Sequence, residues 1–201
     1  GAGIQVTAMA IAGDLVYAGM QNGEIRASAD RGRTWRAFAP GGAGAVQRFW
    51  TDPQDPRVAL AALGAAPDDP FHVSRPVHVL HTMNGGAFWD DFTANLPNVD
   101  AHGVAGDRAS GALYVATDRG VFMTYANLGG IGTIPPWTAL PGLPDAAVID
   151  VKLDAQGTQL WAAVDGYGVY STLAPHRLRD PKVVSAADLI AAMDEAGVSK
   201  T

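Results

Sequence analysis

The sequence predicts an all-β fold built from repeated antiparallel sheets, and three observations support this. First, 24 Gly and 13 Pro among 201 residues indicate many tight turns. Second, short β-rich runs separated by polar turns recur along the chain at similar intervals. Third, no helical pattern is visible before residue 185, which argues against a parallel sheet because parallel strands need long, usually helical, crossovers.

Four β-rich runs of similar pattern define the repeat. They cover 15–19, 58–62, 113–117 and 160–164, so their first residues lie 43, 55 and 47 positions apart, which is the spacing of propeller blades. An apolar strand is expected before each run, at 4–11, 45–50, 101–105 and 148–153, and a third strand after it, at 23–28, 77–82, 120–124 and 168–172. In three copies Trp35, Trp89 and Trp137 begin a fourth strand.

Four antiparallel strands per repeat, arranged around a common axis, predict a β-propeller. The predicted propeller covers 1–175, with blades at about 4–40, 44–97, 99–143 and 146–175. A β-sandwich is the alternative, because short strands with turn signals also suit that fold.

The two ends of the chain shape the expected assembly. The last blade lacks a Trp-led fourth strand, and in the tail at 176–201 a capping box from Ser185 to Asp188 predicts a helix at about 186–196. We therefore hypothesise that four blades are the C-terminal portion of a larger ring, or a half that pairs with a second copy, rather than a closed ring.

One motif occurs twice at the blade interval. Ser28-Ala-Asp-Arg-Gly-Arg-Thr-Trp35 and Thr82-Met-Asn-Gly-Gly-Ala-Phe-Trp89 resemble the Asp-box (BNR repeat) of sialidases, sortilin-type receptors, xyloglucanase-type glycosidases and photosystem II assembly-factor propellers. Asp or Asn can accept N–H groups of its own turn, Gly takes positive φ, and the aromatic ring packs between sheets. In the families that it resembles, this motif lies away from the substrate site. We therefore expect a structural role for its residues, which are Ser28, Asp30, Gly32, Trp35, Thr82, Asn84, Gly86 and Trp89.

Composition excludes several classes of function. The net charge of −6 argues against a nucleic-acid partner. The sequence contains no run of 18 apolar residues, so it predicts no membrane span. The absence of Cys excludes disulfides, thiolate zinc sites and cysteine nucleophiles. We expect no metal and no cofactor, and a protein or carbohydrate ligand.

The carboxylates bear on the question of catalysis. Glu24 and Glu195 are the only glutamates, which argues against the Tyr–Glu chemistry that a resemblance to sialidases implies. A xyloglucanase-like enzyme would use two aspartates as acid and base. The candidates outside obvious turns are Asp90, Asp91 and Asp100.

Candidate binding residues lie in one insertion and one basic cluster. The insertion at 67–76 carries His72 and Arg75, and the cluster around the first motif carries Arg26 and Arg36. His78 and His81 are three residues apart on an expected strand, so they point to opposite faces and cannot share a metal.

The sequence therefore favours a non-catalytic propeller module that binds a protein or a glycan. The resemblance implies an exported bacterial protein, extracellular or periplasmic. The alternative is a xyloglucanase-like or sialidase-like glycoside hydrolase whose site is shared with blades outside this chain.

Overall fold

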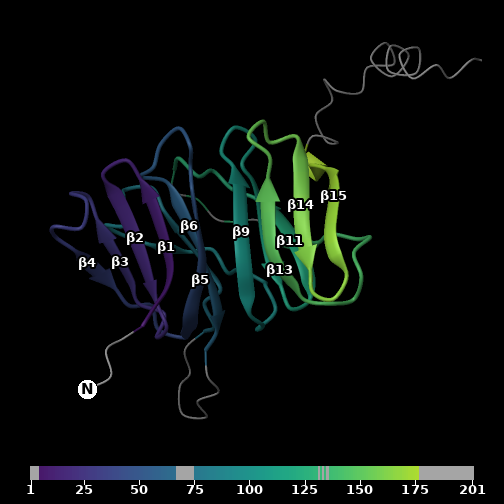
Figure 1. The fold of residues 1–201 in the computed structure, drawn as a ribbon, viewed down its shortest axis with the longest axis horizontal. Coiled ribbons are helices and arrows are strands. Elements are labelled where there is room, and N and C mark those ends of the chain that lie inside the picture. The colour runs from purple at the N-terminus through teal and green to yellow at the C-terminus, as the bar shows by residue number, and fades with distance from the viewer. Residues whose placement is uncertain (1–4, 67–74, 131, 133, 135, 177–201) are drawn as a thin grey trace, which may run out of the picture.

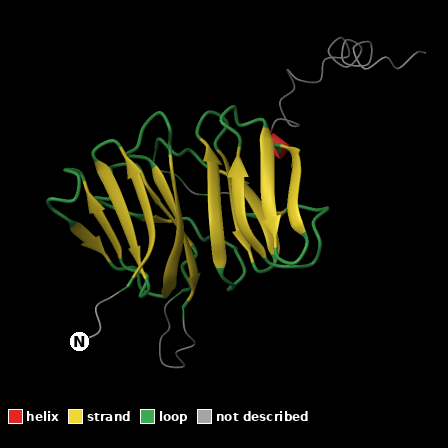
Figure 2. Ribbon diagram, in the orientation of Figure 1, coloured by secondary structure: helices red, strands yellow, loops and turns green. Residues whose placement is uncertain are grey.

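The computed structural model describes residues 5–66, 75–130, 132, 134 and 136–176. Strands joined by loops make up this part of the chain, apart from a short helical turn at 175–176 (Figure 2). Fifteen strands form four separate antiparallel sheets, which we call blades 1 to 4. Blade 1 contains β1 (Val6–Ala12), β2 (Leu15–Met20), β3 (Ile25–Ser28) and β4 (Arg36–Phe38). Blade 2 contains β5 (Ala43–Thr51), β6 (Ala59–Ala65), β7 (Val79–Thr82) and β8 (Asp90–Asp91). Blade 3 contains β9 (Ala101–Asp107), β10 (Ala112–Thr117), β11 (Gly120–Tyr125) and β12 (Thr138–Ala139). Blade 4 contains β13 (Val148–Leu153), β14 (Gln159–Val164) and β15 (Gly168–Leu173).

Within each blade the strands follow chain order, each paired with the next through a hairpin. The first strands of successive blades contact one another in the order β1, β5, β9 and β13, so they form the inner wall of the fan of sheets (Figure 1). This is the blade arrangement of a β-propeller, as the repeat predicted. Blade 4 has three strands among the described residues, which end three positions after β15.

Three hydrophobic cores fill the spaces between successive blades. Because side chains alternate along a strand, β6 places Ala59, Ala61 and Leu63 in the core shared with blade 1. The same strand places Leu60 and Ala62 in the core shared with blade 3. A third core joins β10 to β13 and β14. An inner blade therefore buries both of its faces.

The two motif turns have nearly the same hydrogen bonds. Asp30 Oδ1 accepts the Thr34 N–H at 2.8 Å, and Asn84 Oδ1 accepts the Phe88 N–H at 2.9 Å. The Ser28 hydroxyl accepts the Gly32 N–H, and the Thr82 hydroxyl accepts the Gly86 N–H. Gly32 and Gly86 have φ values of 85° and 81°. Each turn thus closes on itself through its own side chains.

The indoles of Trp89 and Trp137, which begin the fourth strands of blades 2 and 3, pack against the preceding blades. The ring of Trp89 in blade 2 lies 5.9 Å from that of Tyr17 in blade 1, edge to face. Trp137 in blade 3 lies in the core shared with blade 2, and its Nε1–H donates to the carbonyl of Phe92.

Trp35 differs from the expectation of an aromatic ring buried between sheets. Its side chain is 44% exposed, and its Nε1–H donates to the carbonyl of Gly32 in its own turn. The physical reason is its position: Trp35 belongs to blade 1, and no preceding blade lies among the described residues.

Two expectations lie outside the described residues: the position of His72 and the helix at 186–196. Within the described part, no helix has the length and apolar character needed to cross a membrane.

The glycines of the two motifs provide a matched test of blade packing. A Cβ atom on Gly86 would lie 2.4 Å from Cβ of Ala27 in blade 1, whereas on Gly32 it would meet only Trp35, at 3.4 Å. Both substitutions by Ala strain a positive φ, so Gly86→Ala should lower the free energy of unfolding by about 1–3 kcal/mol more than Gly32→Ala, the usual cost of overpacking. Urea denaturation of both variants measures this difference. Equal losses would show that the turn of blade 2 does not depend on close approach to blade 1.

Candidate functional site

A groove runs along the inner wall of the fan, where the first strands of the blades meet. It has a volume of about 850 Å³ and is lined by residues of β5, β9 and β13, by Met9 of β1, and by the turns that follow the three strands. A propeller places its axis here, so we call it the axial groove.

Charged side chains from different blades meet in the axial groove. Arg48 of β5 lies 3.4 Å from Asp150 of β13, and Lys152 lies 3.7 Å from the same carboxylate. Asp150 also lies against β9 at Gly103, where a Cβ atom would be only 2.8 Å from its Oδ1. Because Gly103 has no side chain, the Asp150 carboxylate of blade 4 can lie against blade 3 and contact Arg48 of blade 2.

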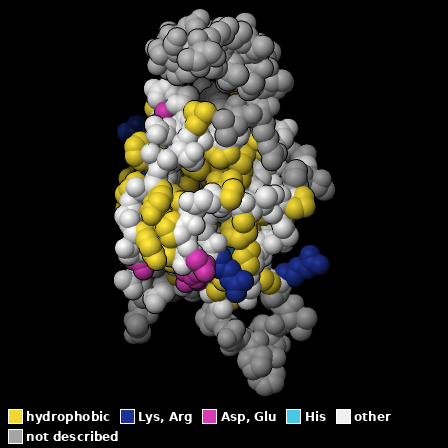
Figure 3. All heavy atoms as spheres, turned by 90° about the vertical axis from the view of Figure 1, so that its right-hand side faces the viewer, with side chains coloured by type: hydrophobic (Ala, Val, Ile, Leu, Met, Phe, Trp, Pro, Cys, Tyr) yellow, Lys and Arg dark blue, Asp and Glu magenta, His cyan; other side chains and the backbone are white. Residues whose placement is uncertain are grey.

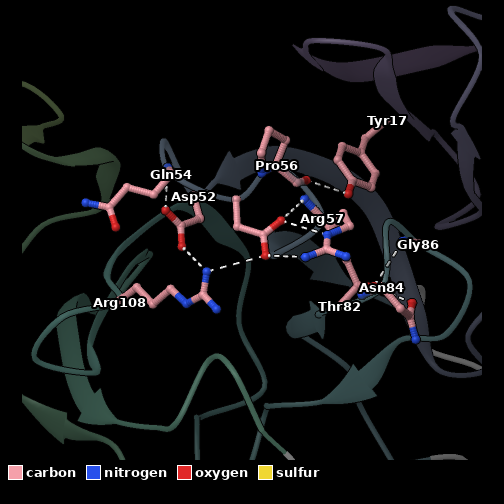
Figure 4. Close-up of polar contacts among 10 residues, drawn as sticks. Tyr17, Asp52, Gln54, Pro56, Arg57, Thr82, Asn84, Gly86 and Arg108 are labelled. Atoms are coloured by element: carbon pink, nitrogen blue, oxygen red, sulfur yellow. Dashed lines mark hydrogen bonds and ion pairs between the residues drawn. The ribbon is translucent and has the colours of Figure 1, made fainter.

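A second charged cluster lies at the end of the groove formed by the turns. Arg108 of blade 3 lies 3.2 Å from Asp52 and 3.5 Å from Asp55, both in the turn after β5 (Figure 4). Asp52 is buried, and its Oδ1 accepts the N–H of Gln54. Arg57 donates to both carboxylate oxygens of Asp55. These hydrogen bonds, together with the nearby charges of Arg57 and Arg108, lower the pKa of Asp55 to about 2.

The same turn is tied to blade 1. The hydroxyl of Tyr17 donates to the carbonyl of Pro56 at 2.9 Å (Figure 4). Burial raises the pKa of this phenol well above its ordinary value, so it stays neutral and remains a donor. The turn after β5 thus joins three blades.

A buried polar chain that the sequence analysis missed lies between blades 3 and 4. The hydroxyl of Tyr114 lies 2.9 Å from Nδ1 of His176, and Nε2 of His176 lies 3.2 Å from Asp107. Burial raises the pKa of Tyr114 to about 12. Because Tyr114 and His176 are buried, we assign this chain a role in joining the end of blade 4 to blade 3. No local sequence pattern around His176 signals it.

The three candidate catalytic aspartates lie outside the axial groove. Asp90 and Asp91 form β8, the outermost strand of blade 2, and both are exposed. Asp91 accepts the N–H of Thr93. Asp100 precedes the innermost strand of blade 3 and accepts the N–H of Ala65 at 2.6 Å. Asp90 and Asp91 therefore lie at the outer edge of blade 2, whereas Asp100 lies beside the inner strand of blade 3.

The candidate binding residues are also separated. Arg26 pairs with Ala37 and Arg36 with Ala27, so the two arginines point to opposite faces of blade 1. Arg26 bonds to Glu24 at 2.6 Å, whereas Arg36 lines a cleft of about 770 Å³ between blades 1 and 2. Arg75 is exposed beside the part of the insertion that is not described.

His78 and His81 are both buried, and each has its own hydrogen-bonding partner. Nε2 of His78 lies 3.1 Å from the side-chain oxygen of Asn98, and Nε2 of His81 lies 3.1 Å from the carbonyl of Leu128. Burial lowers the pKa of both imidazoles. His81 also stacks on Phe92, with ring centroids 4.5 Å apart.

One trio among the described residues has the geometry of cation ligands. Ligand atoms of Asp100, His102 and Asp118 all lie within 4.8 Å of one another. However, Nε2 of His102 lies 2.7 Å from Asp118, the other oxygen of Asp118 accepts the N–H of Asp100, and Asp100 accepts the N–H of Ala65. Hydrogen bonds within the protein therefore account for the close approach of Asp100, His102 and Asp118, and no bound cation is needed to explain it.

Comparison with known proteins shows the fold. No family model matches the chain, and no curated protein matches it. The chain is similar to the computationally designed Ika4 protein, with a TM-score of 0.59 and 12% identity over 86% of this chain and 93% of that one. It is also similar to the GH74 enzyme of Niastella koreensis, with a TM-score of 0.59 and 17% identity over 85% of this chain and 29% of that one. A third similar structure is YCF48 bound to a peptide, with a TM-score of 0.52 and 13% identity over 89% of this chain and 50% of that one.

These likenesses establish a β-propeller module. The chain spans half or less of the lengths of the GH74 enzyme and YCF48.

Acid unfolding tests the Asp55 cluster. The folded-state pKa of about 2 lies below the ordinary value of 3.8, so the unfolded chain takes up the proton first and stability is lost as the pH falls through this window. Asp55→Asn should therefore flatten the dependence of the urea midpoint on pH between these two values. Arg57→Gln removes the largest cause of the lowered pKa and should flatten it similarly. An unchanged slope in both variants would contradict the assigned ion pair.

Proposed function

We propose that this chain is a non-catalytic β-propeller module that binds an extended segment of a protein in the axial groove. The observation that carries the proposal is the pairing of two groove carboxylates with arginines from other blades: Arg48 with Asp150, and Arg108 with Asp52. The groove volume of about 850 Å³ lies within the range of ligand sites.

The same ion pairs argue against glycoside hydrolysis. A glycosidase needs one carboxyl group with a raised pKa, so that it carries a proton to donate. Asp52 and Asp150 instead face cations, and the pKa of neighbouring Asp55 is lowered to about 2. Paired carboxylates of this kind act as fixed anions, which can position the N–H groups and cationic side chains of a peptide.

The aromatic residues of the groove favour a protein over a glycan. The described aromatic side chains that line it are Phe49 and Trp50, and both pack into the cores between blades. An open aromatic face on which a sugar ring could stack is therefore not offered by these two side chains. Several structural neighbours were solved in complexes, including YCF48 with a peptide and a nidogen–laminin complex, which supports a protein ligand. The extracellular or periplasmic location stays a prediction.

Binding arrays test the proposal. The chain is applied to an array of extended peptides of varied charge and to a glycan array, and Arg48→Gln is compared with Arg119→Gln. Arg119 is exposed and does not line the groove, so it is a control for the loss of one positive charge. We expect peptide binding that Arg48→Gln weakens about tenfold, as for the loss of a charged contact, and that Arg119→Gln leaves unchanged.

A second measurement decides between the module and the glycoside hydrolase. The chain is incubated with xyloglucan and sialylated glycans, and reducing ends and free sialic acid are measured. The proposal expects no release above that of a heat-treated sample. Release that disappears in Asp52→Asn would overturn it in favour of the hydrolase.

A further inference from the structure

Large exposed hydrophobic side chains gather on the two end blades. Among the described residues, all but Phe88 belong to blade 1 or blade 4: they are Val6, Met9, Ile11, Trp35, Ile149, Trp161, Tyr167, Val169 and Leu173. Figure 3 shows hydrophobic side chains concentrated on the outward side of blade 4. Large apolar side chains gathered on one exposed face mark a site of association.

Strand register shows what the face of blade 4 is built to do. In each blade, the Ser or Thr near the end of the third strand pairs with one residue of the second strand, and these pairs align the four blades. The pairs are Ser28 with Val16, Thr82 with Ala59, Thr124 with Leu113 and Thr172 with Leu160. The next residue on each second strand is therefore also equivalent, and these residues are Tyr17, Leu60, Tyr114 and Trp161.

In blades 1 to 3 this position is fully buried against the following blade. Tyr17 meets Trp89 of blade 2, and Leu60 lies in the core that contains Trp137 of blade 3. Tyr114 lies in the core shared with blade 4. In blade 4 the same position is Trp161, which is 43% exposed. Trp161 thus occupies the position that receives the next blade.

Blade 1 has the complementary surface. Trp89 and Trp137 pack on the preceding blade, whereas Trp35, at the equivalent position of blade 1, has no preceding blade among the described residues and is 44% exposed. Met9 and Ile11 pair with Ala18 and Val16 on the same outward face of this sheet. Blade 1 therefore presents the surface that elsewhere in the chain inserts into a preceding blade.

We infer that a second copy of this chain covers these faces, head to tail. Blade 1 of one copy packs on blade 4 of its partner, with Trp35 against Trp161 as Trp89 packs on Tyr17. The interface continues the pattern of the three interfaces within the chain, because it joins the same two register positions. It does not depend on the ligand proposed for the groove.

Head-to-tail contacts form a closed ring when a rotation brings the ends together, and open filaments otherwise. Met9 of β1 and residues 150–157 line the same axial groove, so the first and last blades flank a common axis. The inferred assembly is a closed ring of two copies related by a two-fold rotation about that axis, each contributing four blades.

Sedimentation velocity over micromolar to millimolar concentrations tests the inference. We expect the mass of two chains for the unmodified chain and for Phe88→Glu, a control at a 74% exposed side chain that lies on neither end face. Trp161→Glu and Trp35→Glu should each weaken the dimer more than about tenfold, as for an interface hot spot. Circular dichroism confirms that the variants fold. A monomeric unmodified chain, or polymers longer than a dimer, would overturn the closed two-copy ring.

Mixing the two variants distinguishes the pairing mode. In a head-to-tail ring, a pair made of Trp35→Glu and Trp161→Glu chains keeps one intact interface, so the mixture should form dimers that neither variant forms alone. If blade 4 pairs with blade 4 instead, Trp35→Glu stays dimeric by itself, and the inference is wrong.

Discussion

The packing of one motif indole on the preceding sheet is the contact on which the rest of the structure depends. Trp89 lies edge to face on Tyr17, and the turn that carries it approaches so closely that Gly86 leaves no space for a Cβ atom beside Ala27. This contact fixes how far blade 2 is rotated from blade 1. When each blade is held at a fixed rotation relative to the one before it, the first strands lie around a common axis and together form the axial groove.

The charges of the groove follow from the same arrangement. Arg48 and Asp150 belong to blades 2 and 4, and Arg108 and Asp52 belong to blades 3 and 2. Each pair forms only when the blades are correctly placed. The partly exposed pairs contribute little to stability, because solvent screens them. Their role is to fix the charge pattern that a ligand meets.

The fold could be predicted because its signals are local. Each blade has hairpins whose turn residues and alternating side chains lie within about fifty residues, so the repeat and the strands are visible in the sequence. The groove could not be predicted in the same way. Its ion pairs join residues from separate blades, and the chain from Asp107 through His176 to Tyr114 joins the end of blade 4 to blade 3. The exposure of Trp35 was not predicted, because the motif identifies an aromatic ring that can pack on a sheet but does not show whether another sheet lies beside it.

The end blades connect assembly to the groove. Repeat proteins that end freely in solvent usually have polar outer faces on their terminal repeats. The outer face of blade 1 is only partly polar. Arg26 occupies the position that is equivalent, by strand register, to buried Leu80 of blade 2, but Met9 and Ile11 are exposed on the same face as Arg26. In blade 4, Lys152 lines the groove and is also the cross-strand partner of Trp161. A partner packed on Trp161 therefore restricts the side chain that lies beside Asp150, so closing the ring and ordering the groove charges involve the same pair of strands.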